Sequence, residues 1–166
     1  MLARGVGAVF CGINPSLYSA AVGHQFARPG NRFWPAVYGG GFSPRRLHPS
    51  EDMTLLKYGA GITNLVARAT RRADELHPDE IRAGADDLEA RIEEVGAAWV
   101  AFLGLTSYRT AYGERAAGVG PKRRTVGPAR VWVLPNPSGL NAHYKPADFA
   151  RLFGEFRDAA VPAGDG

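Results

Sequence analysis

The stretch Ala98-Trp99-Val100-Ala101-Phe102-Leu103, together with the segment 77–95 before it, decides the fold. A continuous apolar run of this kind is typical of a strand that is buried on both faces of a sheet. In segment 77–95 the apolar residues recur at alternating spacings of four and three, which predicts an amphipathic helix. Pro78 and Gly96 mark the ends of this helix. A helix that leads directly into a buried strand predicts a crossover in a parallel sheet.

The same alternation of helix and strand extends to both ends of the chain. Strand-forming runs lie at 9–11 and 131–134, helices are expected at 31–38, 50–58, 105–112 and from Pro146, and segment 121–128 is expected to be a basic loop. We therefore predict a three-layer α/β/α fold with a central, mostly parallel sheet of about four strands. Residues 1–160 are expected to form one domain and residues 161–166 a disordered tail.

The composition limits the class of protein. A chain of 166 residues is long enough to bury a core of its own without metal or disulfide staples. The single cysteine, Cys11, lies in an apolar run, which favours a core residue over a nucleophile and fits a reducing compartment. No apolar stretch approaches the roughly 20 residues of a membrane span, so we expect no membrane contact and a cytoplasmic protein.

The charge is modest in total but uneven along the chain. The 20 Lys and Arg residues exceed the 16 Asp and Glu residues, for a net charge of +4. The basic residues cluster at 28–46, 68–72 and 122–124, whereas most of the acidic residues fall between Asp74 and Glu94. This asymmetry favours a polyanion on one face, although an ordinary solvated surface explains it equally well.

Two short loops are the best candidates for a functional site. The first is Gly12-Ile13-Asn14-Pro15-Ser16 and the second is Asn136-Pro137-Ser138-Gly139-Leu140, and each follows a strand-forming run. Both loops should therefore leave the carboxyl edge of the sheet, where open α/β sheets bind their ligands. We expect the two loops to meet over one cleft.

The two loops, with Gly30-Asn31-Arg32-Phe33-Trp34, resemble the mismatch-specific uracil/thymine-DNA glycosylase group of the uracil-DNA glycosylase superfamily. The resemblance covers residues 7–160. It implies a three-layer α/β enzyme that removes uracil and some related damaged bases from DNA without a cofactor. The implied partner is double-stranded DNA with a mismatched or damaged base, with single-stranded DNA as an open alternative. The protein would then act as a monomer and associate with the nucleoid through DNA.

Asn14 is the expected catalytic residue. A carboxamide does not titrate usefully, so Asn14 cannot be a general base and can only orient a water by hydrogen bonds. Gly12 and Pro15 shape the loop so that this amide and the backbone N–H groups face the cleft. The resemblance implies that N–H groups near Ile13 and Phe26 stabilise the departing base, as donors at an oxyanion site do.

The resemblance also assigns residues to the base pocket. Phe26 would stack on the extracted base, and Ser19 would lie near the pyrimidine 5-position. Asn64 would orient Asn14 or contact the base, with a local turn hydrogen bond as the alternative. Asn136 would face the base from the second loop. As plain sequence features, Phe26 fits an ordinary core position and Ser19 a turn.

The second loop is expected to hold the DNA open. Leu140 would act as a wedge that fills the space left by the extruded base. Ser138, Gly139 and Asn141 complete the predicted DNA contact, with Ser138 and nearby N–H groups holding a phosphate. An exposed Leu at a loop tip would otherwise need no explanation.

Two departures from the family pattern affect specificity. Ser16 stands where a second Gly is common, which leaves the range of bases open, and Asn141-Ala142 replace a common Ser-Arg pair, which leaves recognition of the opposite base open. His143 or Tyr144 could compensate, or could be a surface aromatic pair. Neither loop holds a Lys or Asp, so we predict a monofunctional enzyme that leaves an abasic site. The scattered histidines and the lone cysteine predict no metal and no iron–sulfur cluster.

Two other functions remain as alternatives. The same fold could recognise mismatched or damaged DNA without hydrolysis, as a binding module. A phosphate- or nucleotide-binding domain built on the Gly12 loop is the third hypothesis, although that loop lacks the Gly repeat and Lys of a P-loop.

Overall fold

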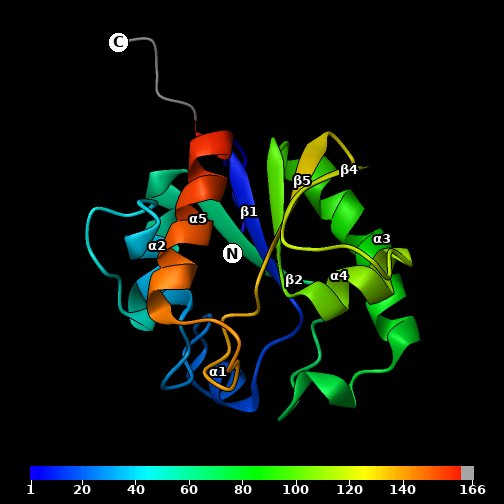
Figure 1. Cartoon of the computed structure of the whole chain (residues 1–166), viewed down its shortest axis with the longest axis horizontal. Helices are drawn as coiled ribbons and strands as arrows, with labels where there is room; N and C mark the ends of the chain where they lie inside the picture. The colour runs from blue at the N-terminus through cyan, green and yellow to red at the C-terminus, as the bar shows by residue number, and fades with distance from the viewer. Residues whose placement is uncertain (162–166) are drawn as a thin grey trace.

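One central sheet of five strands organises the computed structural model, which describes residues 1–161 (Figure 1). Across the sheet the strands are β2 (Ala60–Asn64), β1 (Ala8–Gly12), β3 (Trp99–Leu103), β5 (Ala129–Leu134) and β4 (Gly120–Val126). The first four are parallel to their neighbours, and β4 pairs antiparallel with β5. The predicted α/β fold with a mostly parallel sheet is therefore confirmed.

Helices cover both faces of the sheet (Figure 1). One face is covered by α2 (Phe33–Gly39) and α5 (Pro146–Ala160), and the other by α3 (Pro78–Val95) and α4 (Leu105–Tyr112). The predicted helices at 77–95, at 105–112 and from Pro146 are confirmed, whereas α2 begins at Phe33 instead of residue 31. None of the helices in the described part of the chain is long and apolar enough to span a membrane.

Three further helices complete the description of residues 1–161. They are α1 (Leu17–Val22), which the sequence analysis did not predict, and the 3-10 helices η1 (Pro49–Tyr58) and η2 (Ala73–Glu75). The helix expected at 50–58 is η1, which is kinked at Glu51. The predicted disordered tail lies outside the described residues from residue 162 onward.

Strand β1 shows how the sequence builds two cores. Its side chains alternate, so that Ala8 and Phe10 pack under α2 and α5 while Val9 and Cys11 pack under α3 and α4. All four are buried, as expected for a central parallel strand. Burial raises the pKa of the Cys11 thiol to about 12, so the thiol stays protonated and serves as a core group.

The basic segment 121–128 was predicted as a loop, and this is wrong. Residues Gly120–Val126 form the edge strand β4, which pairs with β5 alone and has a bulge between Lys122 and Thr125. An edge strand needs hydrogen bonds on one side only, so Pro121 is tolerated and no apolar pattern is required. The basic side chains also discourage pairing with another sheet edge.

Candidate functional site

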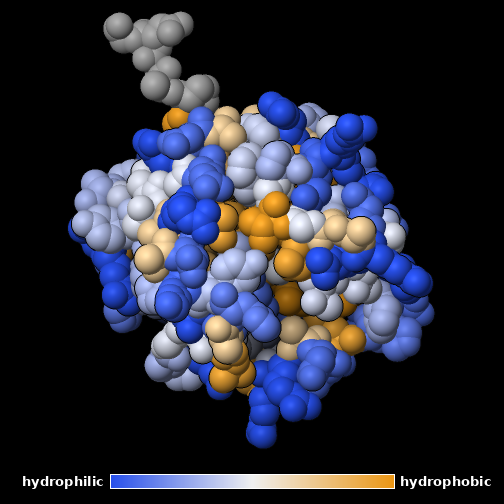
Figure 2. Space-filling view, in the orientation of Figure 1, coloured by the Kyte–Doolittle hydropathy of each residue, from blue (hydrophilic) through white to orange (hydrophobic). Residues whose placement is uncertain are grey.

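A cleft of about 360 Å³ opens at the carboxyl ends of the parallel strands. It lies where the chain order across the sheet reverses, between β1 and its neighbours β2 and β3, which is the usual ligand crevice of such sheets. The two loops meet there, since residues of both line the cleft. Gly104, just after β3, lies between them: a Cβ at this position would be 3.6 Å from Asn136 Cβ and 3.7 Å from Ile13 Cδ1. Figure 2 shows apolar surface in a hollow of this face, with hydrophilic side chains around it.

Most of the predicted site residues share this cleft. Those that line it are Gly12, Ile13, Asn14, Pro15, Ser19, Phe26, Asn64, Asn136, Ser138 and Leu140. Gly139 and Asn141 belong to the same second loop without lining the cleft. The structure therefore brings together segments that are more than a hundred residues apart in sequence.

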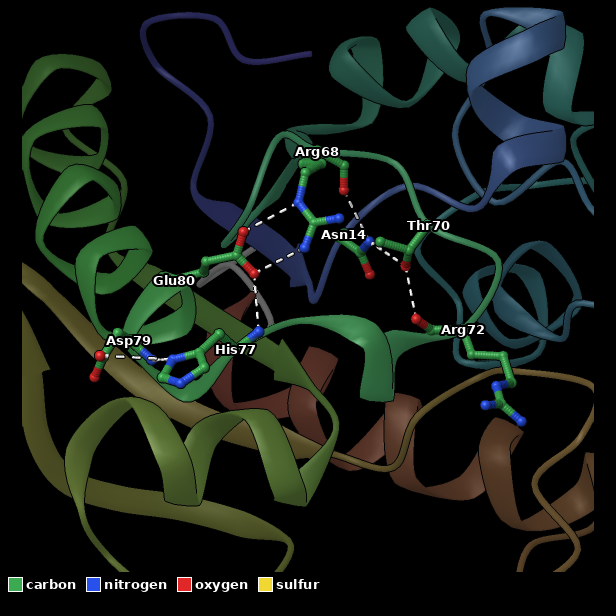
Figure 3. Close-up of polar contacts among 7 residues, drawn as sticks. All are labelled: Asn14, Arg68, Thr70, Arg72, His77, Asp79 and Glu80. Carbon is green, nitrogen blue, oxygen red and sulfur yellow. Dashed lines mark hydrogen bonds and ion pairs between the residues drawn. The ribbon is translucent and has the colours of Figure 1, made fainter.

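The amide of Asn14 is held in one orientation (Figure 3). Its Nδ2 donates to the backbone oxygen of Arg68 at 2.9 Å and to Oγ1 of Thr70 at 2.8 Å. Thr70 in turn donates its hydroxyl hydrogen to the backbone oxygen of Arg72 at 2.7 Å, so it can only accept from Asn14. Both amide hydrogens are used, and Oδ1 is the group left to accept a hydrogen bond in the cleft.

The partner segment of Asn14 is itself fixed to the rest of the fold. Thr70 is buried. Its backbone N–H donates to the Pro15 oxygen and its backbone oxygen accepts from the N–H of Leu17, both at 3.2 Å. Arg68 makes two hydrogen bonds to the Glu80 carboxylate, at 3.0 and 2.9 Å, and these bonds lower the pKa of Glu80 (Figure 3). The first turn of α3 thus braces the segment that orients Asn14.

Phe26 is placed by a strained backbone. Its φ of 50° is unusual for a non-glycine residue, and its ring stacks on Phe33 at 4.2 Å between centroids. Two hydrogen bonds fix the preceding residue, Gln25: its N–H donates to Asp52, and Trp34 Nε1 donates to its backbone oxygen. Strain that is over-determined in this way is typical of ligand-binding positions.

The residue after Phe26 is also fixed, through Ser19. The Ser19 side chain is buried, and its Oγ accepts the N–H of Ala27 at 3.0 Å. Its hydroxyl is also hydrogen-bonded to that of Ser16, 3.1 Å away, which caps the start of α1 by accepting the N–H of Ser19. The Ser16 hydroxyl is therefore engaged with α1, and this is how the loop accommodates the departure from glycine.

Asn64 and Gly12 form one wall of the cleft. Asn64 Nδ2 lies 3.5 Å from Gln25 Oε1, at the limit of a hydrogen bond, and no hydrogen bond joins Asn64 to Asn14 among residues 1–161. Arg91 from α3 fixes the end of the strand by donating to the Asn64 oxygen at 3.0 Å. A Cβ at Gly12 would lie 2.5 Å from Asn64 Oδ1 and 3.2 Å from Phe26 Cζ, so only glycine leaves room for both side chains.

The second loop is shaped by its own polar side chains. Asn136 Oδ1 accepts the N–H of Ser138 at 2.9 Å, and Ser138 Oγ accepts the N–H of Leu140 at 3.2 Å. Asn141 Nδ2 donates to the backbone oxygen of Asn136 at 3.0 Å. These turns present Leu140 with 72% of its surface exposed. Asn141, the departure from the family pattern, thus closes the loop.

The two residues beyond Asn141 behave differently. His143 is exposed, whereas the Tyr144 ring packs against Phe149 at 5.9 Å between centroids. They are therefore not a packed surface pair.

Basic side chains surround the mouth of the cleft. Arg28, Arg71 and Arg72 line it, and Asp74, the one carboxylate among the described residues that line it, lies 3.3 Å from Arg72. The surplus of guanidinium groups suits a polyanion at this mouth. The basic residues of β4 belong to another part of the surface, where Arg124 pairs with Glu114 at 2.8 Å. Within residues 1–161 no three His, Cys, Asp or Glu side chains are grouped to hold a metal ion.

Sequence reasoning missed several residues of the site. Thr70 and Gln25 were not predicted, because they come from segments with no recognisable pattern, whereas Arg28, Arg71 and Arg72 belong to the basic clusters that favoured a polyanion on one face. Thr70 forms an isolated parallel bridge with Ser16, and such a long-range pairing leaves no pattern in the local sequence.

Comparison with known families agrees with this site. The model of a family described as the uracil DNA glycosylase superfamily matches residues 3–157. Membership of this family means a hydrolase that acts on uracil in DNA, and hence DNA binding and a role in DNA repair. Because the match spans nearly the whole chain, this protein belongs to the uracil DNA glycosylase superfamily.

Proposed function

We propose that the protein is a monofunctional, mismatch-specific glycosylase that excises uracil by base flipping and leaves an abasic site. The observation that carries this proposal is the Asn14 amide, whose two hydrogens are both donated to the protein. Its Oδ1 can accept a hydrogen from a water and so aim a water lone pair at the sugar. Asn14 is then an orienting group and not a base.

The departing base would be stabilised by the opposite wall of the cleft. Cleavage of the N-glycosidic bond leaves negative charge on the base, and fixed N–H donors can stabilise such charge. The N–H groups of Ile13 and Phe26 donate to no other group among the described residues, so they are available to the base oxygens. The Phe26 ring offers a stacking surface, worth roughly 1–3 kcal/mol per base.

Mismatch preference would arise before any contact with the base. Extruding a base from a duplex requires roughly a few kcal/mol, and less for a mispaired one. Leu140 at the exposed tip of the second loop would fill the vacated position in the stack. A base that is already poorly paired would therefore be excised faster than the same base in a Watson–Crick pair.

A strand-cleavage assay tests this function. Labelled duplexes with G·U, A·U or G·T pairs, and single-stranded uracil, are incubated with the protein in EDTA and then treated with hot alkali. We expect breaks at uracil that depend on alkali, fastest for G·U. Intact strands in every lane, with DNA binding retained, would instead indicate a binding module. Trapping of a covalent protein–DNA adduct by borohydride would contradict the monofunctional mechanism.

The substitution Thr70→Val should slow the chemical step. Valine keeps the volume of Thr70 but removes the oxygen that accepts from Asn14, so the amide loses one of its two anchors. We expect kcat to fall about tenfold with KM nearly unchanged, because misoriented water affects the transition state more than binding. Steady-state kinetics on a G·U duplex would measure both.

The matched control is Thr63→Val. Thr63 is also a buried threonine whose oxygen accepts a hydrogen bond, at 2.8 Å from Arg91, but it does not line the cleft. The control should lose stability without losing kcat. Equal kcat values for Thr70→Val and the control would show that Thr70 does not orient Asn14.

A further inference from the structure

Arg32 connects the second loop to the packed part of the fold. It belongs to the segment Gly30-Asn31-Arg32-Phe33-Trp34, in which Phe33 and Trp34 help to place Phe26, but Arg32 itself has no part in that arrangement and does not line the cleft. Its Nη1 donates to the backbone oxygens of Asn141 at 2.9 Å and Tyr144 at 2.6 Å. Its backbone N–H donates to Pro137 O at 2.8 Å. Arg32 therefore contacts the loop on both sides of Leu140.

These contacts are strong ones. Hydrogen bonds from a guanidinium are roughly twice as strong as neutral ones, and this guanidinium pairs with no carboxylate among the described residues. Its Cζ also lies 5.5 Å from the centre of the buried Phe149 ring. The charged group of Arg32 therefore binds the backbone oxygens of one loop.

The surroundings of Arg32 are rigid and lie close to the loop. The next residues, Phe33 and Trp34, are buried in the core. A Cβ at Gly139 would lie 2.7 Å from the Gly30 oxygen, so the loop rests directly on the backbone just before Arg32. The other hydrogen bonds that the loop makes within residues 1–161 span only a few residues and would move with it.

We propose that Arg32 is a positioning residue that sets the height and direction of the Leu140 wedge above the cleft. This proposal rests on the proposed function, because it assigns Arg32 to base extrusion. Arg32 then matters where a base must be pushed out of its pair, and matters little where the uracil has no pairing partner. A preformed wedge also avoids ordering the loop when DNA binds.

The test compares two duplexes that differ only opposite the uracil. One carries guanine there, and the other an abasic analogue that leaves the uracil unpaired. In single-turnover reactions, Arg32→Met should slow excision from the G·U duplex about tenfold or more, and from the other duplex less than about threefold. Arg32→Lys should recover part of the lost rate, because an ammonium can still donate to the two carbonyls.

A double variant asks whether Arg32 acts through Leu140. If it does, Arg32→Met combined with Leu140→Ala should be no slower on the G·U duplex than Leu140→Ala alone, within about threefold. Arg151→Met, on the exposed face of α5, is the matched control and should leave both rates unchanged. Equal losses on both duplexes, or independent losses that multiply in the double variant, would overturn the proposal.

A readout without turnover separates this proposal from the proposed function. With 2-aminopurine beside the uracil, binding of the unaltered protein should raise its fluorescence as the stack opens, and Arg32→Met should reduce this rise. An equal rise with both proteins would overturn the role of Arg32 even if uracil is excised. Absence of excision by the unaltered protein, with the fluorescence difference retained, would overturn the glycosylase function alone.

Discussion

Replacing Asn14 with alanine is expected to lower kcat for uracil excision by at least about 10²-fold, with KM changed far less. The side chain removed lines the cleft and has its nitrogen anchored to Arg68 O and Thr70, so that its oxygen is the group left to bind water. Without it, water still enters but has no fixed direction toward the sugar. Single-turnover rates on a G·U duplex, with DNA affinity measured separately, would give the size of the effect.

Asn14→Asp is the informative companion to this variant. An ionised carboxylate has no hydrogen to donate, so it would face two acceptors, the Arg68 oxygen and a Thr70 hydroxyl already committed to Arg72. We therefore expect less than about a tenth of the normal rate, although the new side chain is a stronger base. Full activity of Asn14→Asp would show that the anchoring of the amide is not what matters.

The largest loss of stability is expected from Gly84→Ala, a change that normally strengthens a helix. Alanine is favoured over glycine inside a helix by about 1 kcal/mol. At Gly84 in α3, however, the new Cβ would lie 2.1 Å from the backbone oxygen of Leu65 and 2.8 Å from its carbonyl carbon. Backbone on both sides must move apart, so we expect a loss of about 3 kcal/mol or more.

Thermal unfolding would measure this loss as a fall in Tm of about 6 °C or more. The control is the same substitution in the interior of α5, Gly154→Ala, where the nearest atoms to the new Cβ are 3.9 Å away. That variant should gain up to about 1 kcal/mol. A Tm for Gly84→Ala at or above that of the unaltered protein would mean that α3 can shift away from Leu65 freely.

The parts of the fold that follow from local pattern were predicted correctly. Segment 77–95 has an apolar stripe and clear end signals, and it forms α3 between residues 78 and 95. The edge strand β4 was mistaken for a loop because most of its side chains are basic and exposed, so it lacks the apolar pattern of a strand that packs against a core. Strand β2 was not predicted because its glycine and threonine dilute the apolar run.

The candidate site divides in the same way. Asn14 and Leu140 were found because short loops with recognisable residues follow buried strands. Thr70 could not be found, since its role depends on a hydrogen bond across 56 positions of the chain. Arg32 was noticed only as part of a motif and of a basic stretch. Its contacts with a loop more than a hundred residues away become visible only when the chain is folded.

The two halves of the cleft are attached to the fold in different ways, and this has a consequence for how such a protein can change. The half with Asn14 continues from β1, one of the most central strands, and is hydrogen-bonded to the segment after β2. The half with Leu140 is a surface loop between β5 and α5, and residues 140, 142 and 143 at its tip are exposed. Evolution or engineering can therefore exchange the loop tip, and with it the proposed contact with the DNA duplex, while the anchoring of Asn14 stays intact.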